Sequence, residues 1–269
     1  MKTEKKECAT PGDLFVLLIG HGSKLPYNRE MADMHARLLR DKGYRVYMAF
    51  NEITDPNIED TMMLMIKDGA EEIVALPLFI ASGKHTEKEI PFKLGIPEGY
   101  GTGKSTRYGR EVTVHYNEPF GNDPDVTQIL FQRLKETGCS DDAGVLLVAH
   151  GSSMRHNSDL ANETSDRLRA AGIRNVFVGF NEYNEPTIED SYAKIIDAGC
   201  DEIVVLPMFL ASGTHVSEQI PEKLGIQRDR NFGIVKKGDR NIAIYYAETL
   251  GLNRGMNDIL VKKIQRSGV

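Results

Sequence analysis

The chain contains the segment EIVALPLFIASGKHTEKEIPFKLGI at residues 72–96, and a near copy, EIVVLPMFLASGTHVSEQIPEKLGI, follows at residues 202–226. The two segments align without a gap and share 16 identities in 25 positions. Another pair, FNEITDPNIEDT at 50–61 and FNEYNEPTIEDS at 180–191, has the same displacement of 130 residues. Self-similarity at a fixed spacing indicates that one structural unit is duplicated. We therefore expect two domains of the same fold.

Each copy alternates apolar, β-branched runs with segments of helical pattern. The first run leads into His-Gly-Ser, as VLLIGHGS at 16–23 and as VLLVAHGS at 145–152, and predicts a buried strand. Three further runs in each copy predict strands, with helices between and after them. Strands alternating with helices are typical of an α/β fold with parallel sheets and right-handed crossovers. The sequence thus predicts two domains, residues 1–138 and 139–269, each a small parallel sheet of four strands flanked by helices.

Composition and charge exclude several classes of protein. The 269 residues include 33 Lys and Arg against 39 Asp and Glu, and this net charge of −6 gives no general affinity for nucleic acid or an anionic membrane. No run approaches the roughly 18 apolar residues of a membrane span, and the polar start MKTEKKECATPGD predicts no secretory signal. Cys8, Cys139 and Cys200 form no CxxC pair and predict no disulfide framework. We expect a reduced, cytoplasmic protein without nucleic-acid or membrane partners.

Each copy carries two histidines and one glutamate where predicted strands end. Ligands of parallel sheets bind beyond the carboxyl ends of the strands, so side chains far apart in sequence can converge there. Two imidazoles and a carboxylate are good ligands for cobalt, nickel, iron or zinc ions. The candidate catalytic and metal-binding residues are His21, Glu52 and His85 in the first copy, and His150, Glu182 and His215 in the second.

Small residues beside these side chains would let a flat ligand approach the backbone. The candidate substrate-binding residues are Gly22, Ser23, Ser82 and Gly83, and Gly151, Ser152, Ser212 and Gly213.

A purely structural explanation also exists for each residue. A single His-Gly at a strand end is more often a turn than a ligand, and Glu52 alone could supply a charge at the start of the following helix. Both copies nevertheless retain all three residues, whereas neighbouring positions such as Lys24 and Ser153 differ. Maintenance of the fold seldom requires a repeated histidine in a loop, so we favour a functional site.

Two other motifs predict no site. GYGTGKST at 99–106 resembles a phosphate-binding loop, but three residues instead of four separate Gly99 from Gly103, and no predicted strand precedes it. We interpret this segment as a flexible loop. Ser23 and Ser152 follow His-Gly without a Gly-x-Ser-x-Gly elbow, which argues against a hydrolase triad.

The motifs LLIGHGS, AFNE with a proline four residues later, and SGKH together resemble the class II tetrapyrrole chelatases, specifically the CbiX-type sirohydrochlorin chelatases. The similarity covers both copies, so the chain looks like the long, duplicated form of a family whose short members are single copies that dimerise. The resemblance implies two α/β lobes facing each other across a central cleft. It also implies insertion of a divalent metal into a tetrapyrrole without ATP.

By this resemblance, the paired histidines of each copy handle the metal, and Glu52 and Glu182 match the acidic position of the family. The implied partner is sirohydrochlorin. The implied metal is Co²⁺ as a substrate, with Ni²⁺ and Fe²⁺ as alternatives, and no prosthetic group is implied. One copy could act, both could act in turn, or both could flank one central cavity, which we favour because fused halves would replace a symmetric dimer. A monomer and a homodimer both remain open.

Two functions of other classes also remain open. A non-heme iron oxygenase uses two histidines and a carboxylate, but usually on a β-barrel. A non-catalytic carrier would bind metal or tetrapyrrole without accelerating metal uptake.

Because sirohydrochlorin carries many carboxylates, we expect the surface of the protein that binds it to be basic. The candidate cations are Lys24, Lys84, Lys88 and Arg155.

Overall fold

Strand β1 (Phe15–Gly20) lies between two other strands of the first sheet, and all six of its residues are buried. Its counterpart β6 (Gly144–Ala149) occupies the same place in the second sheet and is buried throughout. A strand buried on both faces requires cover on both sides of the sheet, which explains its uninterrupted apolar sequence.

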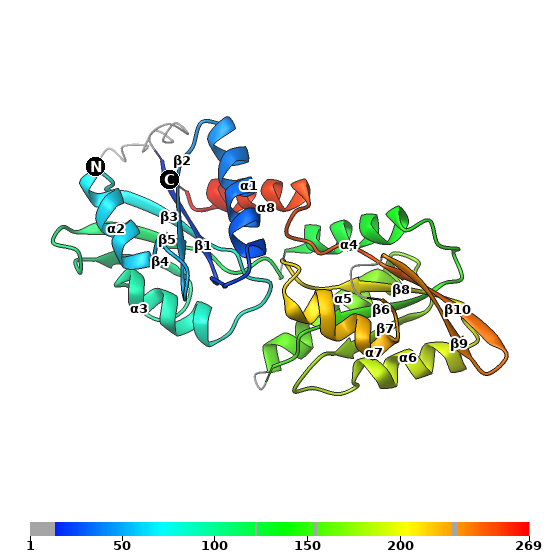
Figure 1. Cartoon of the computed structure of the whole chain (residues 1–269). Coiled ribbons are helices and arrows are strands. Elements are labelled where there is room, and N and C mark those ends of the chain that lie inside the picture. The colour runs from blue at the N-terminus through cyan, green and yellow to red at the C-terminus, as the bar shows by residue number, and fades with distance from the viewer. Residues whose placement is uncertain (1–13, 122, 153–154, 228–230, 269) are drawn as a thin grey trace. The chain divides into compact units, whose positions relative to one another are not determined.

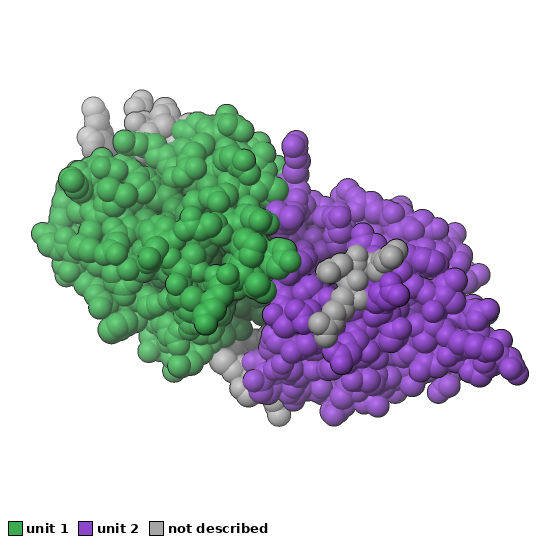
Figure 2. Space-filling model, viewed as in Figure 1, with its two compact units in different colours: residues 1–119, 257–269 green, residues 120–256 purple. Residues whose placement is uncertain are grey.

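The computed structural model describes residues 14–121, 123–152, 155–227 and 231–268, without the side chains of residues 155–157. Cys8, Ser153 and the side chain of Arg155 therefore lie outside the described part of the chain. The chain forms two compact units, shown in green and purple in Figure 2. Within the described ranges, every helix is too short or too polar to span a bilayer.

The elements follow one another in the same order in both repeats (Figure 1). In the first repeat they are β1 (Phe15–Gly20), α1 (Tyr27–Asp41), β2 (Arg45–Phe50), α2 (Ile58–Lys67), β3 (Glu72–Pro77), the π-helix η2 (His85–Glu89), α3 (Ile90–Leu94), β4 (Gly101–Ser105), β5 (Val112–Tyr116) and α4 (Pro124–Glu136). In the second they are β6 (Gly144–Ala149), α5 (Arg155–Ala170), β7 (Val176–Phe180), α6 (Ile188–Asp197), β8 (Glu202–Pro207), the π-helix η3 (His215–Gln219), α7 (Ile220–Leu224), β9 (Phe232–Lys237), β10 (Arg240–Tyr246) and α8 (Arg254–Arg266).

The two sheets have the same topology. The strand orders are β2-β1-β3-β5-β4 and β7-β6-β8-β10-β9. The first four strands of each order pair in parallel, as the sequence predicts. Two similar α/β lobes are therefore confirmed.

Each sheet also has a fifth strand that the sequence analysis did not identify. β4 pairs antiparallel with β5, and β9 pairs antiparallel with β10. The interpretation of residues 99–106 as a flexible loop is therefore wrong. Gly103 is required there because a Cβ would lie 2.9 Å from the side chain of Ile96, and Gly233 meets Ile226 at the same distance. Of the glycines that suggested a phosphate loop, Gly103 lets the edge strand lie close to Ile96, whereas Gly99 and Gly101 have open space at their Cβ positions.

The last helix of each repeat belongs to the other repeat's compact unit. Unit 1 consists of residues 1–119 and 257–269, and unit 2 of residues 120–256, so unit 2 contains α4 and unit 1 contains most of α8. In unit 1, the buried Asn257 of α8 donates from Nδ2 to the backbone oxygen of His35 in α1 at 3.2 Å. The predicted boundaries, 1–138 and 139–269, follow the sequence repeat, whereas the packing units exchange these helices.

Candidate metal centre

The sheet register brings the candidate residues of each repeat to one edge. In the first sheet, Gly20 of β1 pairs with Phe50 of β2, and Ile19 pairs with Pro77 of β3. His21 follows β1 directly, Glu52 lies two residues after the end of β2, and His85 begins the π-helix after β3. The second sheet repeats this arrangement, so three segments more than 30 residues apart converge as the sequence predicts.

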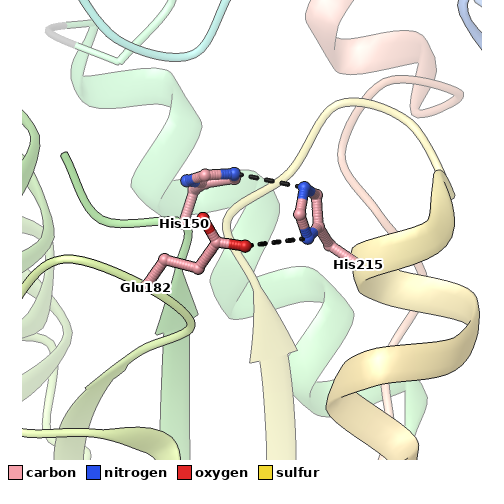
Figure 3. Close-up of side chains that lie close together, drawn as sticks. All are labelled: His150, Glu182 and His215. Atoms are coloured by element: carbon pink, nitrogen blue, oxygen red, sulfur yellow. Dashed lines mark hydrogen bonds and ion pairs between the residues drawn. The ribbon is translucent and has the colours of Figure 1, made fainter.

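In unit 2, His150, Glu182 and His215 point toward one another from three different elements (Figure 3). The two Nε2 atoms of His150 and His215 lie 3.2 Å apart, and the ring planes are inclined at 83°. Oε1 of Glu182 lies 3.8 Å from Nδ1 of His215, beyond hydrogen-bond range. All three ligand atoms lie within 4.8 Å of one another.

The other ring nitrogen of each histidine, Nδ1, already has a hydrogen-bond partner. Nδ1 of His150 lies 3.0 Å from the backbone oxygen of Gly151, and Nδ1 of His215 lies 2.6 Å from Oε1 of Gln219. A peptide or amide carbonyl oxygen can only accept, so in the neutral ring both Nδ1 atoms carry the proton. The lone pairs of both Nε2 atoms then remain available to bind a cation placed next to the two rings. Two nitrogen ligands of a tetrahedral ion, each about 2.0–2.1 Å from it, lie about 3.3–3.4 Å apart, so the observed spacing suits one ion.

Unit 1 has the same arrangement of two histidines and a glutamate, with Glu89 as an additional carboxylate. The rings of His21 and His85 lie 4.9 Å apart between centroids at 76°, and Nδ1 of His21 faces the backbone oxygen of Gly22 at 3.1 Å. Oε1 of Glu52 lies 3.7 Å from Nδ1 of His85. The group of ligand atoms that lie within 4.8 Å of one another here consists of Glu52, His85 and Glu89, without His21.

Glu89 occupies the position that Gln219 has in unit 2. Its Oε2 accepts from Nδ1 of His85 at 2.6 Å, and its Oε1 pairs with Lys84 at 3.0 Å. Hydrogen bonds from Lys84 and then His85 lower the pKa of Glu89 to about 2. Glu89 therefore adds a fixed negative charge beside His85, which the neutral Gln219 does not supply beside His215.

Two further pairs of residues support the histidines. Nδ2 of Asn51 donates to Glu89 at 3.4 Å, and Lys93 donates to the side chain of Asn51 at 3.1 Å. In unit 2, Asn181 donates to Gln219 at 3.1 Å and Lys223 to the backbone oxygen of Asn181 at 2.8 Å. The sequence analysis missed these residues, although the asparagine and the lysine stand inside the duplicated segments, where their repetition could have identified them.

Most of the small residues predicted to bind substrate have partners within the protein. A Cβ on Gly22 would lie 1.8 Å from the backbone oxygen of Glu52, so this glycine admits a neighbouring loop; Gly151 does the same beside Glu182. The hydroxyl of Ser82 accepts from Tyr100 at 2.9 Å. Gly83 and Gly213 have open space around their Cβ positions. Gly22 and Gly151 therefore allow the loop of the first histidine to pack against the loop of the glutamate.

Two of the predicted substrate-binding cations have acidic partners. Lys84 pairs with Glu89, and Nζ of Lys88 lies 4.0 Å from Glu98. Both lysine side chains are mostly exposed, at 75% and 62%, so these pairs leave the amino groups accessible to solvent.

Comparison with known proteins identifies the same family in both repeats. The CbiX family model matches residues 15–137 and 144–267. A protein of Halobacterium salinarum named probable sirohydrochlorin cobaltochelatase is 29% identical over 77% of this chain and 75% of its own length. A sirohydrochlorin cobaltochelatase of Methanosarcina acetivorans is 36% identical over 46% of this chain and 95% of its own length, and so corresponds to one repeat.

A solved structure shares the fold. SirB from Bacillus subtilis with Fe³⁺ superposes with a TM-score of 0.77 at 18% identity, covering 95% of this chain and 96% of that one. This likeness extends over both repeats and supports the two-lobed α/β architecture.

Proposed function

The chain belongs to the CbiX family, and from this premise we propose that it is a sirohydrochlorin cobaltochelatase. It is a metal chelatase of the lyase class, and the reaction is the insertion of Co²⁺ into sirohydrochlorin without ATP, on the route to cobalamin. The metal ion is a substrate, and no prosthetic group takes part.

The observation that carries the proposal is the pair of facing Nε2 atoms of His150 and His215, 3.2 Å apart. Each Nε2 atom presents a lone pair because both Nδ1 atoms donate elsewhere. Such a pair holds a divalent ion through few ligands, which leaves the remaining coordination positions to the incoming pyrrole nitrogens. A resident structural metal would instead be enclosed by four ligands.

Metal insertion makes two chemical demands. The ion must lose water, and the macrocycle must lose two pyrrole N–H protons. In our scheme, the histidine pairs bind the ion in place of water, and Glu52 and Glu182 accept protons or orient the histidines. Their side chains, 40% and 38% exposed, are open to exchange a proton with solvent.

Co²⁺ is the proposed metal because the relatives named above are cobaltochelatases. The donor set itself does not select it, since nitrogen and oxygen ligands follow the general affinity order of divalent ions. Ni²⁺ and Fe²⁺ are the alternatives, and a carrier of metal or tetrapyrrole is the non-catalytic alternative.

The test is anaerobic absorbance spectroscopy of sirohydrochlorin with the purified protein and, in turn, Co²⁺, Ni²⁺ and Fe²⁺. We expect faster insertion than in the protein-free reaction, with Co²⁺ the most accelerated. Acceleration of another metal alone would replace cobalt in the proposal. Stoichiometric binding of sirohydrochlorin with no acceleration for any metal would favour the carrier and contradict the enzyme.

A further inference from the structure

An exposed apolar side chain follows the site glutamate in both repeats. Ile53 comes after Glu52 and Tyr183 after Glu182, and their side chains are 72% and 73% exposed. Among the described residues other than glycine, only these two have a positive φ, 59° and 62°. The two repeats therefore share a special backbone conformation at one position, with different apolar residues in it.

This conformation is unfavourable for both residues. The amide of Thr54 donates to the backbone oxygen of Glu52 at 2.5 Å, and the amide of Asn184 donates to that of Glu182 at 2.7 Å, so each apolar residue is the centre of a three-residue turn. A turn of this kind with positive φ is rare and strained, and most so for a β-branched residue such as isoleucine. Glycine would occupy it without strain.

Contacts from the His-Gly-Ser loop hold the turn in place. In unit 1, Gly22 lies so close to Glu52 that no Cβ would fit, and the amide of Ser23 donates to Oγ1 of Thr54 at 2.9 Å. In unit 2, Gly151 and Glu182 repeat the close approach, and the amide of Ser152 donates to Oδ1 of Asn184 at 2.7 Å. The strain is thus imposed by the same loop that carries the first histidine of the site.

The side chains themselves do not contribute to the folded core, because they are nearly three-quarters exposed. Tyr183 instead lies beside the candidate metal centre, with its ring 6.3 Å from that of His150 between centroids and inclined by only 20°. This apolar side chain is exposed, lies beside the histidine pair, and is held on a backbone that would suit glycine better. These features indicate that it serves ligand binding and not the stability of the fold.

We propose that Ile53 in unit 1 and Tyr183 in unit 2 each contact the apolar face of a tetrapyrrole macrocycle while the histidines of the same unit hold the metal. This inference rests on the proposed function, because it takes the substrate to be a flat conjugated ring. A macrocycle that receives an ion from the histidines must present its face to them, and the neighbouring side chains then meet that face. Aromatic and aliphatic surfaces both suit such a contact, which explains why the residue type differs while its position is kept.

The test is the affinity for metal-free sirohydrochlorin, measured anaerobically by absorbance titration. In the double variant Ile53→Gly/Tyr183→Gly, we expect a dissociation constant at least tenfold higher than in the wild type. The affinity for Co²⁺ alone should stay within twofold, since no ligand is removed. Thermal stability should be equal or higher, because glycine relieves the strained φ.

Three further variants sharpen the result. Ile53→Asn/Tyr183→Asn introduces a polar residue that tolerates positive φ, and should bind sirohydrochlorin as weakly as the double glycine variant. Ile53→Tyr should retain the wild-type affinity. Ile234→Ala removes an isoleucine of comparable exposure, 65%, on β9, and should change nothing.

The outcomes separate this contact from the function on which it rests. A wild-type protein that binds sirohydrochlorin and inserts metal, with a double glycine variant that binds equally tightly, would overturn the contact alone. A wild-type protein that does not bind sirohydrochlorin would overturn both the contact and the proposed function.

Discussion

At the scale of single residues, the facing nitrogens of the histidine pair are the central feature of the site. Their direction depends on the groups that accept from the opposite side of each ring, and those groups are a backbone oxygen for His150 and a glutamine for His215. Replacing such a supporting group typically lowers metal affinity or activity by about 10–100-fold.

Removing one histidine from each repeat should abolish metal insertion without unfolding the protein. In His85→Ala/His215→Ala each pair loses one ligand, and both side chains are more than a third exposed, so the core is unaffected. We expect the anaerobic insertion rate to fall to the protein-free rate, with an unchanged circular dichroism spectrum. The two single variants, His85→Ala and His215→Ala, show whether one repeat suffices. An unchanged rate in the double variant would contradict the scheme.

Glu89 and Gln219 are expected to make the two sites unequal. The additional charge of Glu89 should strengthen cation binding in unit 1, and exchanging the two residues should exchange the affinities. We expect Glu89→Gln, with the other site disabled by His150→Ala/His215→Ala, to bind Co²⁺ about tenfold more weakly. Gln219→Glu, with His21→Ala/His85→Ala, should bind it about tenfold more tightly. Calorimetric titration measures both, and shifts in the same direction would refute the charge argument.

At the scale of secondary-structure elements, buried tyrosines fix the π-helices that begin with the second histidine of each repeat. The hydroxyl of Tyr116 in β5 donates to the backbone oxygen of Thr86 at 2.9 Å, and that of Tyr246 in β10 donates to Val216 at 3.0 Å. These side chains are only 2% and 8% exposed. The fourth strand of each sheet therefore holds the helix that presents His85 or His215.

These tyrosines should make the protein sensitive to alkali. Burial raises the pKa of Tyr116 and of Tyr246 above the usual 10, so the folded state keeps protons that the unfolded state releases. The contribution of these protonated tyrosines to folding stability is complete below pH 10, the usual pKa of tyrosine, and is lost as the pH rises through their raised pKa values. We expect the free energy of unfolding, from urea titrations at pH 8 to 11, to decline above about pH 10.

Tyr116→Phe/Tyr246→Phe is the variant that tests this source. Above about pH 10, its free energy of unfolding should decline less steeply than that of the wild type. At pH 8 the variant should be less stable by about 1–3 kcal/mol per site, because a buried carbonyl loses its hydrogen-bond donor. Tyr27→Phe, at an exposed position, is the control. If the free energy of unfolding declined equally steeply above pH 10 in the variant and the wild type, these tyrosines would not be the source of the sensitivity to alkali.

The elements also show what the sequence could and could not predict. The central strands β1, β3, β6 and β8 were predictable because their buried runs are nearly continuous, and the histidines because both copies keep them. β4 was missed because GTGKS has no apolar alternation and most of it is exposed at the sheet edge. Glu89 was missed because its counterpart is a glutamine, so repetition gave no signal. The strained turn at Ile53 depends on contacts with Gly22, which the sequence of the turn does not contain.

At the scale of the whole molecule, the exchange of α4 and α8 is the feature that a repeat alone could not predict. The sequence repeat places α4 with the first copy and α8 with the second, whereas unit 2 contains α4 and unit 1 contains most of α8. Sequence periodicity does not specify which unit the last helix of a repeat packs against.

A substitution at the end of the second repeat should therefore weaken the first unit. Asn257 is 2% exposed and donates to the backbone oxygen of His35. Asn257→Ala should reduce stability by about 1 kcal/mol and accelerate amide hydrogen exchange in α1. Asp258→Ala, exposed on the same helix, is the matched control. Faster exchange confined to unit 2 would contradict the assignment of α8 to unit 1.

The exchanged helices also determine how the protein would respond to limited proteolysis. Residues 140–142, between the repeats, are exposed, so a protease could cleave the chain there. Neither fragment would then hold a complete unit, because the first would keep α4 of unit 2 and the second would keep α8 of unit 1. The nicked protein would elute as one species from a sizing column and fall into two pieces only in denaturant.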